Sequence, residues 1–228
     1  MMHRLIDRGK IYFYLVLLLI LLSIHNLNLV NNINNFFKIK KIILISNIEE
    51  ALNQEISNSL DKYYSRNIFS LDSGDIKTML DKFNIISEYK IKKEYPSVIK
   101  INLIETKILA YYLENNQKIY VGENGKKIRK KQIVSNDLPI IEGEVDIKKF
   151  LKLKKALINN GFKLNDFIIF YFNKSNRWDL VYNNQIIVKL PIDEINYSIS
   201  LFKDIIESSN IDEIKIIDLR IKNRIVLL

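Results

Sequence analysis

The sequence feature that most constrains this chain is an apolar run from Ile11 to Ile24, in which Ser23 is the only side chain that is neither aliphatic nor aromatic. With the next residues to Val30, the run is long enough to reach across a hydrocarbon core of about 30 Å. A positive flank of the kind that stays on the cytoplasmic side precedes it, formed by Arg4, Arg8 and Lys10. We therefore predict a cytoplasmic tail at residues 1–10, a membrane anchor at 11–30, and later residues outside the cytoplasm.

Two other interpretations of this run fit the sequence less well. A cleaved signal peptide needs a small-residue cleavage site, and the following HNLNLVNNINNFF contains neither alanine nor glycine. A buried helix of a soluble domain normally shows a polar stripe at helical spacing, which residues 11–22 do not have. Tyr12 and Tyr14 also fall where an interfacial aromatic belt is expected. The pattern favours an uncleaved anchor, with the other two readings left open.

Composition excludes several kinds of chemistry. The 228 residues include no cysteine, so disulfides, thiolate metal sites and thiol nucleophiles are absent. The two histidines, His3 and His25, lie at the terminus and beside the apolar run, so no histidine-based site is expected in the globular part. The net charge of +9 includes a dense basic run at residues 126–131, for which the pattern favours solvated hairpin surface over a docking patch for acidic partners, envelope polymers or lipid headgroups. About two hundred residues remain for two small domains.

Residues 31–106 predict a small α+β module. A β-branched run predicts a strand at 36–46, and an apolar stripe from Ile48 with Asn47 as N-cap predicts a helix to about residue 64. Asp72 is expected to cap a second helix to about residue 83. Two alternating strands around a turn at 95–97 complete a strand, helix, helix, strand, strand order, which we expect to place two helices on one face of a three-stranded sheet.

Residues 107–228 predict a mixed sheet with at least two helices. Asn124-Gly125 favours a hairpin turn within 118–127, and residues 138–143 predict an edge strand that ends at Gly143. Amphipathic patterns predict helices at 146–159, capped by Asp146 and stopped by Gly161, and at 193–209. Further strands are expected at 167–172, 177–182, 185–190 and 217–222.

Several motifs carry a resemblance to a known family. The order of elements after the apolar run, and the segment EYPSVIKINLIETKILAYY, are similar to the POTRA domain and its closing hairpin in the FtsQ/DivIB bacterial cell-division proteins. LPIIEG at 138–143 and the pair Arg177-Trp178 also resemble elements of this family. The most specific match is the word IDLR at 217–220, where this chain has Ile221 in place of the family's frequent tyrosine.

The resemblance implies a partner-binding strand near the end of the chain. An edge strand has unpaired backbone groups that a partner strand can extend, and its charged side chains select the partner. By resemblance, the contacts would come from Asp218, Leu219, Arg220, Ile221, Lys222 and Arg224, with Arg177 and Trp178 as secondary contacts. For Trp178 the residue pattern itself favours a core position.

The resemblance also implies a function: a non-enzymatic, single-pass inner-membrane scaffold of the cell-division complex. Its bulk would lie in the periplasm at the septum. It would bind FtsB- and FtsL-like proteins and other membrane proteins of the complex, help recruit and regulate septal peptidoglycan synthesis, and need no cofactor, metal, nucleic acid or small-molecule substrate.

Other classes of function fit the sequence less well. The main alternative is a secretion or envelope-assembly factor with POTRA domains that binds client polypeptides by strand addition. Such proteins usually carry repeated modules or a membrane barrel, and the sequence shows neither. An enzyme is disfavoured because Asp179 and Asp218 belong to no paired catalytic motif, and no phosphate-binding glycine loop or nucleophile elbow is present.

Overall fold

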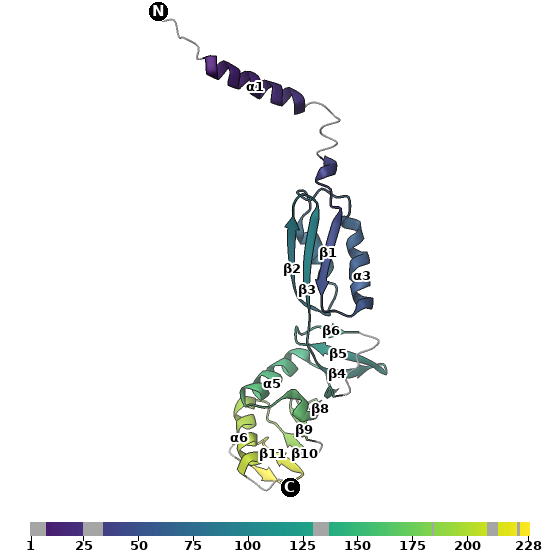
Figure 1. Cartoon of the computed structure of the whole chain (residues 1–228). Helices are drawn as coiled ribbons and strands as arrows, with labels where there is room; N and C mark the ends of the chain where they lie inside the picture. Colours follow the sequence, from purple (N-terminus) through teal and green to yellow (C-terminus); the bar gives the residue numbers. More distant parts are fainter. Residues whose placement is uncertain (1–7, 25–33, 130–136, 184, 209–213, 223) are drawn as a thin grey trace, which may run out of the picture. The chain divides into compact units, whose positions relative to one another are not determined.

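The computed structural model describes residues 8–24, 34–129, 137–183, 185–208, 214–222 and 224–228, and Figure 1 shows its elements. The chain divides between Ile104 and Glu105 into two compact units, the first of which also contains the N-terminal helix. The fold is α+β, as the sequence predicts. The expected tail at residues 1–7, the end of the expected anchor at 25–30, and Lys130 and Lys131 of the basic run lie outside the described residues.

The apolar run forms helix α1, Arg8–Ile24, which is 17 residues long. Large apolar side chains from Ile11 to Leu22 are exposed along it. Within the described residues, no helix combines the length and apolar character needed to cross a bilayer.

The rest of the first unit has the predicted order of elements. A three-stranded sheet has the order β1-β3-β2, with β1 and β3 parallel. Its elements are β1 (Lys41–Ser46), α3 (Glu50–Leu60), the 3₁₀ helix η1 (Asp61–Tyr63), α4 (Ser73–Leu80), β2 (Ile86–Glu94) and β3 (Val98–Glu105). This is the POTRA-like arrangement that the sequence analysis predicted.

The core of the first unit lies between the helices and one face of the sheet. Along β3, Ile99 and Ile101 are fully buried, whereas Asn102 and Ile104 are exposed, so only one face of the strand is covered. Helices α3 and α4 contribute their apolar stripes to this core through Ile56, Leu60, Ile76, Met79 and Leu80. The expected placement of two helices on one sheet face is therefore confirmed.

Of the helix caps and strand ends predicted for this unit, one agrees with the structure and two do not. Asp72 caps α4 by accepting a hydrogen bond from the Gly74 amide at 2.8 Å, as expected. The predicted strand at 36–46 begins only at Lys41. Residue 36 ends a helical turn, and Lys38 forms an isolated antiparallel bridge with Asn67 instead of joining the sheet. The expected N-cap Asn47 is wrong, since Glu49 occupies the N-cap of α3 without a side-chain hydrogen bond.

The second unit is a nine-stranded mixed sheet of order β12-β11-β10-β9-β8-β7-β4-β5-β6. Its strands are β4 (Ile108–Glu114), β5 (Gln117–Gly122), β6 (Lys127–Ile128), β7 (Ile140–Gly143), β8 (Phe167–Phe172), β9 (Trp178–Tyr182), β10 (Ile186–Lys189), β11 (Ile216–Asp218) and β12 (Val226–Leu227). The helices are α5 (Ile147–Asn159), the 3₁₀ helix η2 (Leu164–Asp166) and α6 (Ile195–Ser208). The prediction of a mixed sheet with at least two helices is confirmed.

The sheet is mixed because three of its neighbouring pairs are parallel, and a helical crossover joins the strands of two of them. Helix α5 joins the parallel neighbours β7 and β8, and helix α6 joins the parallel neighbours β10 and β11. Both helices bury an apolar face in one hydrophobic core, which includes Phe150, Leu153 and Leu157 of α5, Ile199, Phe202 and Ile205 of α6, and Phe167, Phe170 and Trp178 of the sheet. The Asp146 carboxylate accepts a hydrogen bond from the Lys149 amide at 3.1 Å, and Gly161 follows α5 with φ +87°, both as predicted.

Two strand predictions in this unit need correction. The segment 138–143 was expected at a sheet edge, but β7 lies inside the sheet between β4 and β8. Strand β4 was not predicted as a strand of its own. It pairs with β5 around Asn115 and Asn116, which both have positive φ, so the hairpin expected within 118–127 is the shorter β5–β6 pair.

Candidate partner-binding edge

The strand predicted at 217–222 is shorter than expected and is not the edge of the sheet. Strand β11 ends at Asp218 and is paired on both sides, in parallel with β10 and antiparallel with β12. The alternation of apolar residues continues to Ile221, yet Leu219 is buried while Ile221 is 60% exposed. The prediction that residues 218–222 form the open edge is therefore wrong, because the chain turns after Leu219 and returns along β11.

Within the described sheet, β12 is the last strand on this side. The amide and the carbonyl of Leu228 both bond to Ile216, at 3.0 and 2.9 Å. Since neighbouring residues of an antiparallel strand alternate in direction, the N–H and C=O of Leu227 point away from β11. Leu227 is 45% exposed and Leu228 is 68% exposed. The edge available for another strand is thus an apolar one at Val226–Leu227.

The turn before β12 carries the predicted charged residues. Arg220 folds back onto Asp218, and its Nε lies 2.8 and 2.9 Å from the two carboxylate oxygens, while its Nη2 is 2.5 Å from Oδ2. The Arg220 amide also donates to Oδ1 of Asp218 at 3.1 Å. Hydrogen bonding from the Arg220 guanidinium lowers the pKa of Asp218, and the same pairing raises the pKa of Arg220. This bidentate pair fixes the turn that follows β11.

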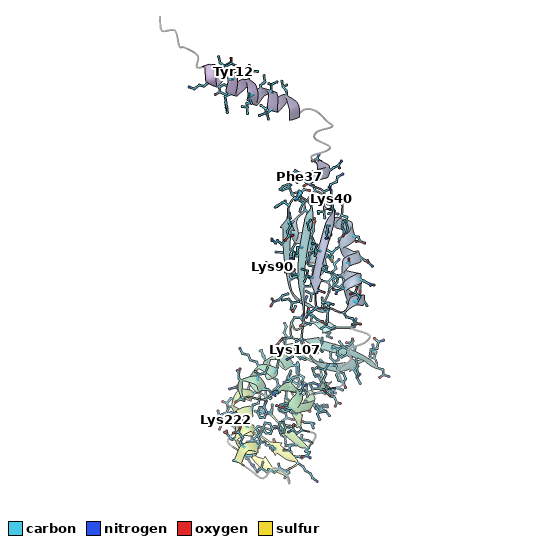
Figure 2. All side chains as sticks on the ribbon, viewed as in Figure 1. Tyr12, Phe37, Lys40, Lys90, Lys107 and Lys222 are labelled. Carbon is cyan, nitrogen blue, oxygen red and sulfur yellow. The ribbon has the colours of Figure 1, made fainter. Side chains whose placement is uncertain are left out.

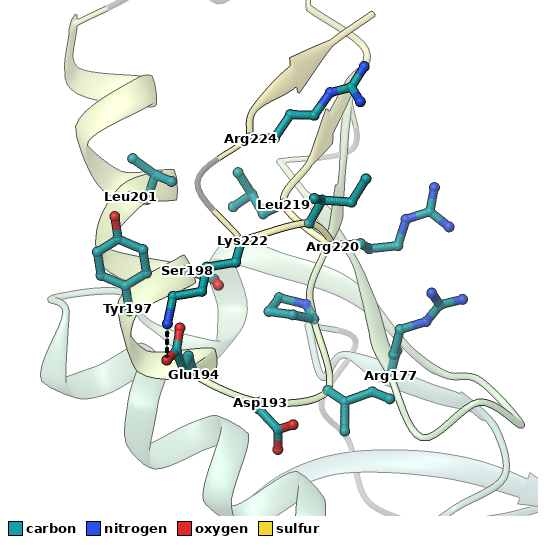
Figure 3. A pocket seen from close by; sticks show the side chains of 13 residues that line it. Arg177, Asp193, Glu194, Tyr197, Ser198, Leu201, Leu219, Arg220, Lys222 and Arg224 are labelled. Atoms are coloured by element: carbon teal, nitrogen blue, oxygen red, sulfur yellow. Dashed lines mark hydrogen bonds and ion pairs between the residues drawn. The ribbon is translucent and has the colours of Figure 1, made fainter.

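A second ion pair ties the turn to helix α6. The Lys222 Nζ donates to the carboxylate of Glu194 at 2.7 Å (Figure 3), and this hydrogen bond raises the pKa of Lys222. Glu194 itself has φ +57° and precedes α6 directly. The turn and the start of α6 are therefore connected by side chains that lie 28 residues apart in sequence.

A hollow of about 420 Å³ lies between this turn and α6. Six of the predicted contacts line it, namely five of the main set and Arg177 of the secondary pair. The five are Leu219, Arg220, Ile221, Lys222 and Arg224. Other lining residues, which the sequence did not assign to the site, include Ile192, Glu194 and Tyr197. Figure 3 shows the guanidinium groups of Arg177, Arg220 and Arg224 on the same side of the hollow. Asp218 does not line it but anchors Arg220.

The two predicted secondary contacts differ in their surroundings. Trp178 is 2% exposed and packs against Phe172 with ring centroids 4.6 Å apart, so it is a core residue with no surface for a partner. Arg177 lines the hollow, and its buried Nε has no hydrogen-bond acceptor among the described residues. A buried donor without an acceptor is energetically costly, and no side chain among the described residues offsets that cost at Arg177.

The missed features had weak sequence signals. Lys222, Asn223 and Arg224 are three consecutive polar residues followed by an apolar run, which is a turn-and-strand pattern that separates β12 from β11. Glu194 and Tyr197 reach the site only through the packing of α6, and nothing in the local pattern assigns them to it. Among the described residues, no cluster of His, Cys, Asp or Glu is suited to hold a metal ion.

Comparison with known proteins gives consistent results over both units. The family model for the FtsQ-type POTRA domain matches residues 37–106, and the model for the C-terminal region of the cell division protein FtsQ/DivIB matches residues 110–220. The cell division protein FtsQ of Rickettsia prowazekii is 27% identical over 192 residues, which cover 82% of this chain and 71% of that protein.

More distant proteins also match. The cell division protein DivIB of Clostridium tetani is 26% identical over 171 residues, covering 67% of this chain and 64% of that protein. A solved structure, the major extracytoplasmic domain of DivIB from Geobacillus stearothermophilus, shares 15% identity at a TM-score of 0.33 and covers 44% of this chain and 90% of that one.

Proposed function

Because the chain belongs to the FtsQ/DivIB family of bacterial cell-division proteins, we propose that it is a non-enzymatic scaffold of the division complex that binds FtsB- and FtsL-like partners through the β12 edge. In this proposal a partner strand pairs with Leu227, whose backbone groups point outward. The partner's acidic side chains meet the arginines beside the hollow, and its apolar side chains pack on Ile221 and Leu228. The exposed end of the sheet at β12 is the observation that carries this proposal.

Strand addition at this edge combines two kinds of recognition. Main-chain hydrogen bonds provide affinity without sequence preference, whereas the neighbouring side chains choose the partner. Arg220 is held by a bidentate pair with Asp218, so less of its side-chain entropy remains to be lost when a partner binds. Such preorganisation favours a specific partner over indiscriminate pairing at the edge.

The proposal includes a membrane location. The apolar side chains of α1 are exposed, and a bilayer would cover them if α1 and the residues after it form the anchor. The N-terminus would then be cytoplasmic and both units periplasmic, at the inner membrane of the septum. Anchoring this chain and its partners in one membrane would raise their effective concentration and support recruitment of septal peptidoglycan synthesis.

Binding should be tested with the full chain and the FtsB-like protein of the same genome. Leu227→Pro removes the outward N–H and should abolish co-purification, while Leu227→Ala keeps this N–H and should retain most of the binding. The double variant Arg220→Glu with Ile221→Asp should also fail to bind, and Lys152→Glu on the exposed face of α5 controls for the change in charge. If the Arg220/Ile221 double variant and Leu227→Pro both bind the partner as well as the parent chain does, the proposal that the partner binds at the β12 edge is wrong.

Cellular location is a separate test. A fluorescent fusion of the full chain is expected at mid-cell in dividing cells. A uniform envelope signal in cells that also carry the FtsB-like partner would contradict the role in division.

A further inference from the structure

Four aromatic side chains form a continuous row of contacting rings at one end of the first unit. The Phe36 and Phe37 rings meet edge to face at 5.2 Å, the Phe37 and Phe69 rings at 4.9 Å, and the Phe69 and Tyr95 rings stack at 4.8 Å with an interplanar angle of 18°. We call these four residues the aromatic cluster. They come from three separate segments, so the fold rather than local sequence brings them together.

The backbone holds these segments in place. The Ile68 amide donates to the carbonyl of Phe37, and the Lys40 amide donates to that of Ser97, both at 2.9 Å. Figure 2 shows Phe37 and Lys40 at the same end of the three-stranded sheet. Main-chain hydrogen bonds therefore join the segment of Phe37 to the segments that carry Phe69 and Tyr95.

The aromatic cluster remains largely exposed. Phe36 is 55% exposed, and Phe69 and Tyr95 are each 57% exposed. Rings that served only the core would be covered, as Tyr63 is at 1%. A fixed group of exposed aromatic rings is characteristic of a surface that another body covers.

The segments that carry the aromatic cluster are strongly basic. Residues 34–41, 65–71 and 92–97 hold six basic side chains and one carboxylate, that of Glu94, which Lys92 already neutralises at 3.2 Å. The basic residues are Lys38, Lys40, Lys41, Arg66, Lys92 and Lys93. The surface around the exposed rings therefore attracts an anionic partner.

We propose that the aromatic cluster and its lysines dock on an anionic lipid bilayer. Aromatic rings settle at the level of the lipid headgroups, and lysines around them bind acidic headgroups. Phe36 follows the apolar helix α1 by only twelve residues, so the chain itself brings the cluster close to the membrane of the proposed anchor. This inference goes beyond partner binding: it orients the first unit on the membrane and uses the proposed function only for the anchor.

The absence of cysteine makes a clean experiment available. Ser70→Cys places a single thiol next to Phe69 at an exposed position, and an environment-sensitive fluorophore is attached there. Ala51→Cys, exposed in the first turn of α3 beyond the opposite end of β1, is the matched control. The labelled full chains are reconstituted into vesicles that contain a headgroup-level lipid quencher in either phosphatidylglycerol or phosphatidylcholine.

The expected result is quenching at position 70 that is at least about twofold stronger in phosphatidylglycerol than in phosphatidylcholine. It should weaken at about 1 M salt, where the Debye length falls to roughly 3 Å. Position 51 should stay unquenched. Replacing Lys38, Lys40 and Lys41 by Gln should remove the preference for anionic lipid, and Phe69→Ser with Tyr95→Ser should remove most of the quenching while far-UV circular dichroism stays unchanged.

Three results would overturn the inference. If the chain floats with the vesicles but the fluorophore at position 70 is not quenched, the lipid-docking inference is wrong and the proposed membrane anchor still holds. The fluorophore at position 70 could instead escape the lipid quencher but become less accessible to solvent as the protein-to-lipid ratio rises. That result would assign the surface to a second copy of the chain. A chain that does not float with any vesicle would overturn the anchor and this inference together, without bearing on partner binding at β12.

Discussion

Leu228 exchanges two backbone hydrogen bonds with Ile216, and this exchange attaches β12 to the rest of the sheet. Deleting Val226–Leu228 should expose the outer edge of β11 and lower the free energy of unfolding by about 1–3 kcal/mol, since each lost bond contributes roughly 1 kcal/mol. Thermal denaturation followed by circular dichroism checks this. A variant as stable as the full chain would show that β12 contributes nothing to the fold.

The Asp218–Arg220 pair makes stability depend on pH. Hydrogen bonds from Arg220 lower the pKa of Asp218 below its unfolded value near 3.9, so the pair stabilises the fold above about pH 4 and the contribution is lost as pH falls through the lower folded pKa. Asp218→Asn should therefore lower the melting temperature at pH 7, with a difference from the parent that shrinks at acid pH. A difference that stays constant between pH 7 and pH 3 would argue against the pair as the cause.

Gly143 lies against the carbonyl of Phe172 so closely that a Cβ atom would come within 2.1 Å of that oxygen. Gly143→Ala is expected to destabilise the fold by more than about 4 kcal/mol, or to prevent folding. Gly161→Ala is the matched control, because its φ of +87° is similar but its Cβ would meet only the end of the Lys203 side chain at 3.5 Å. The control should lose about 1–2 kcal/mol. Equal losses in chemical denaturation would mean that the close approach is irrelevant.

Trp178 should report on the core and not on partner binding. It is the only tryptophan and is 2% exposed, so its fluorescence should resist quenching by acrylamide with or without the partner. Trp178→Phe should destabilise the fold by about 1–3 kcal/mol and leave the affinity for the partner unchanged. Loss of affinity in a variant that is still folded at the assay temperature would restore Trp178 as a contact.

Local patterns were sufficient for much of this fold, and their failures have a common physical cause. The stripes of α3, α5 and α6, and the caps Asp72 and Asp146, depend on neighbours in sequence and were predicted correctly. The order of the strands in the sheet, and which strand lies at its edge, depend on pairing between segments that are far apart in the sequence. Strand β4, buried at Leu109, Ala110 and Tyr112, lacks the alternation of a half-exposed strand, and the two residues of β12 are too few to give any periodicity. The sequence therefore pointed to residues that line one hollow but assigned them to the wrong strand, and their role as partner contacts stays a prediction.

The Lys222–Glu194 pair allows positioning to be separated from direct recognition. If the pair mainly holds the turn against α6, Lys222→Glu should weaken partner binding about tenfold, because two carboxylates then repel and the turn moves away. Exchanging the two residues, Lys222→Glu with Glu194→Lys, restores the attraction and should recover most of the affinity. Titration calorimetry with the FtsB-like partner measures both variants. If the exchanged variant binds as weakly as the single one, Lys222 contacts the partner directly through its charge, and positioning is not its role.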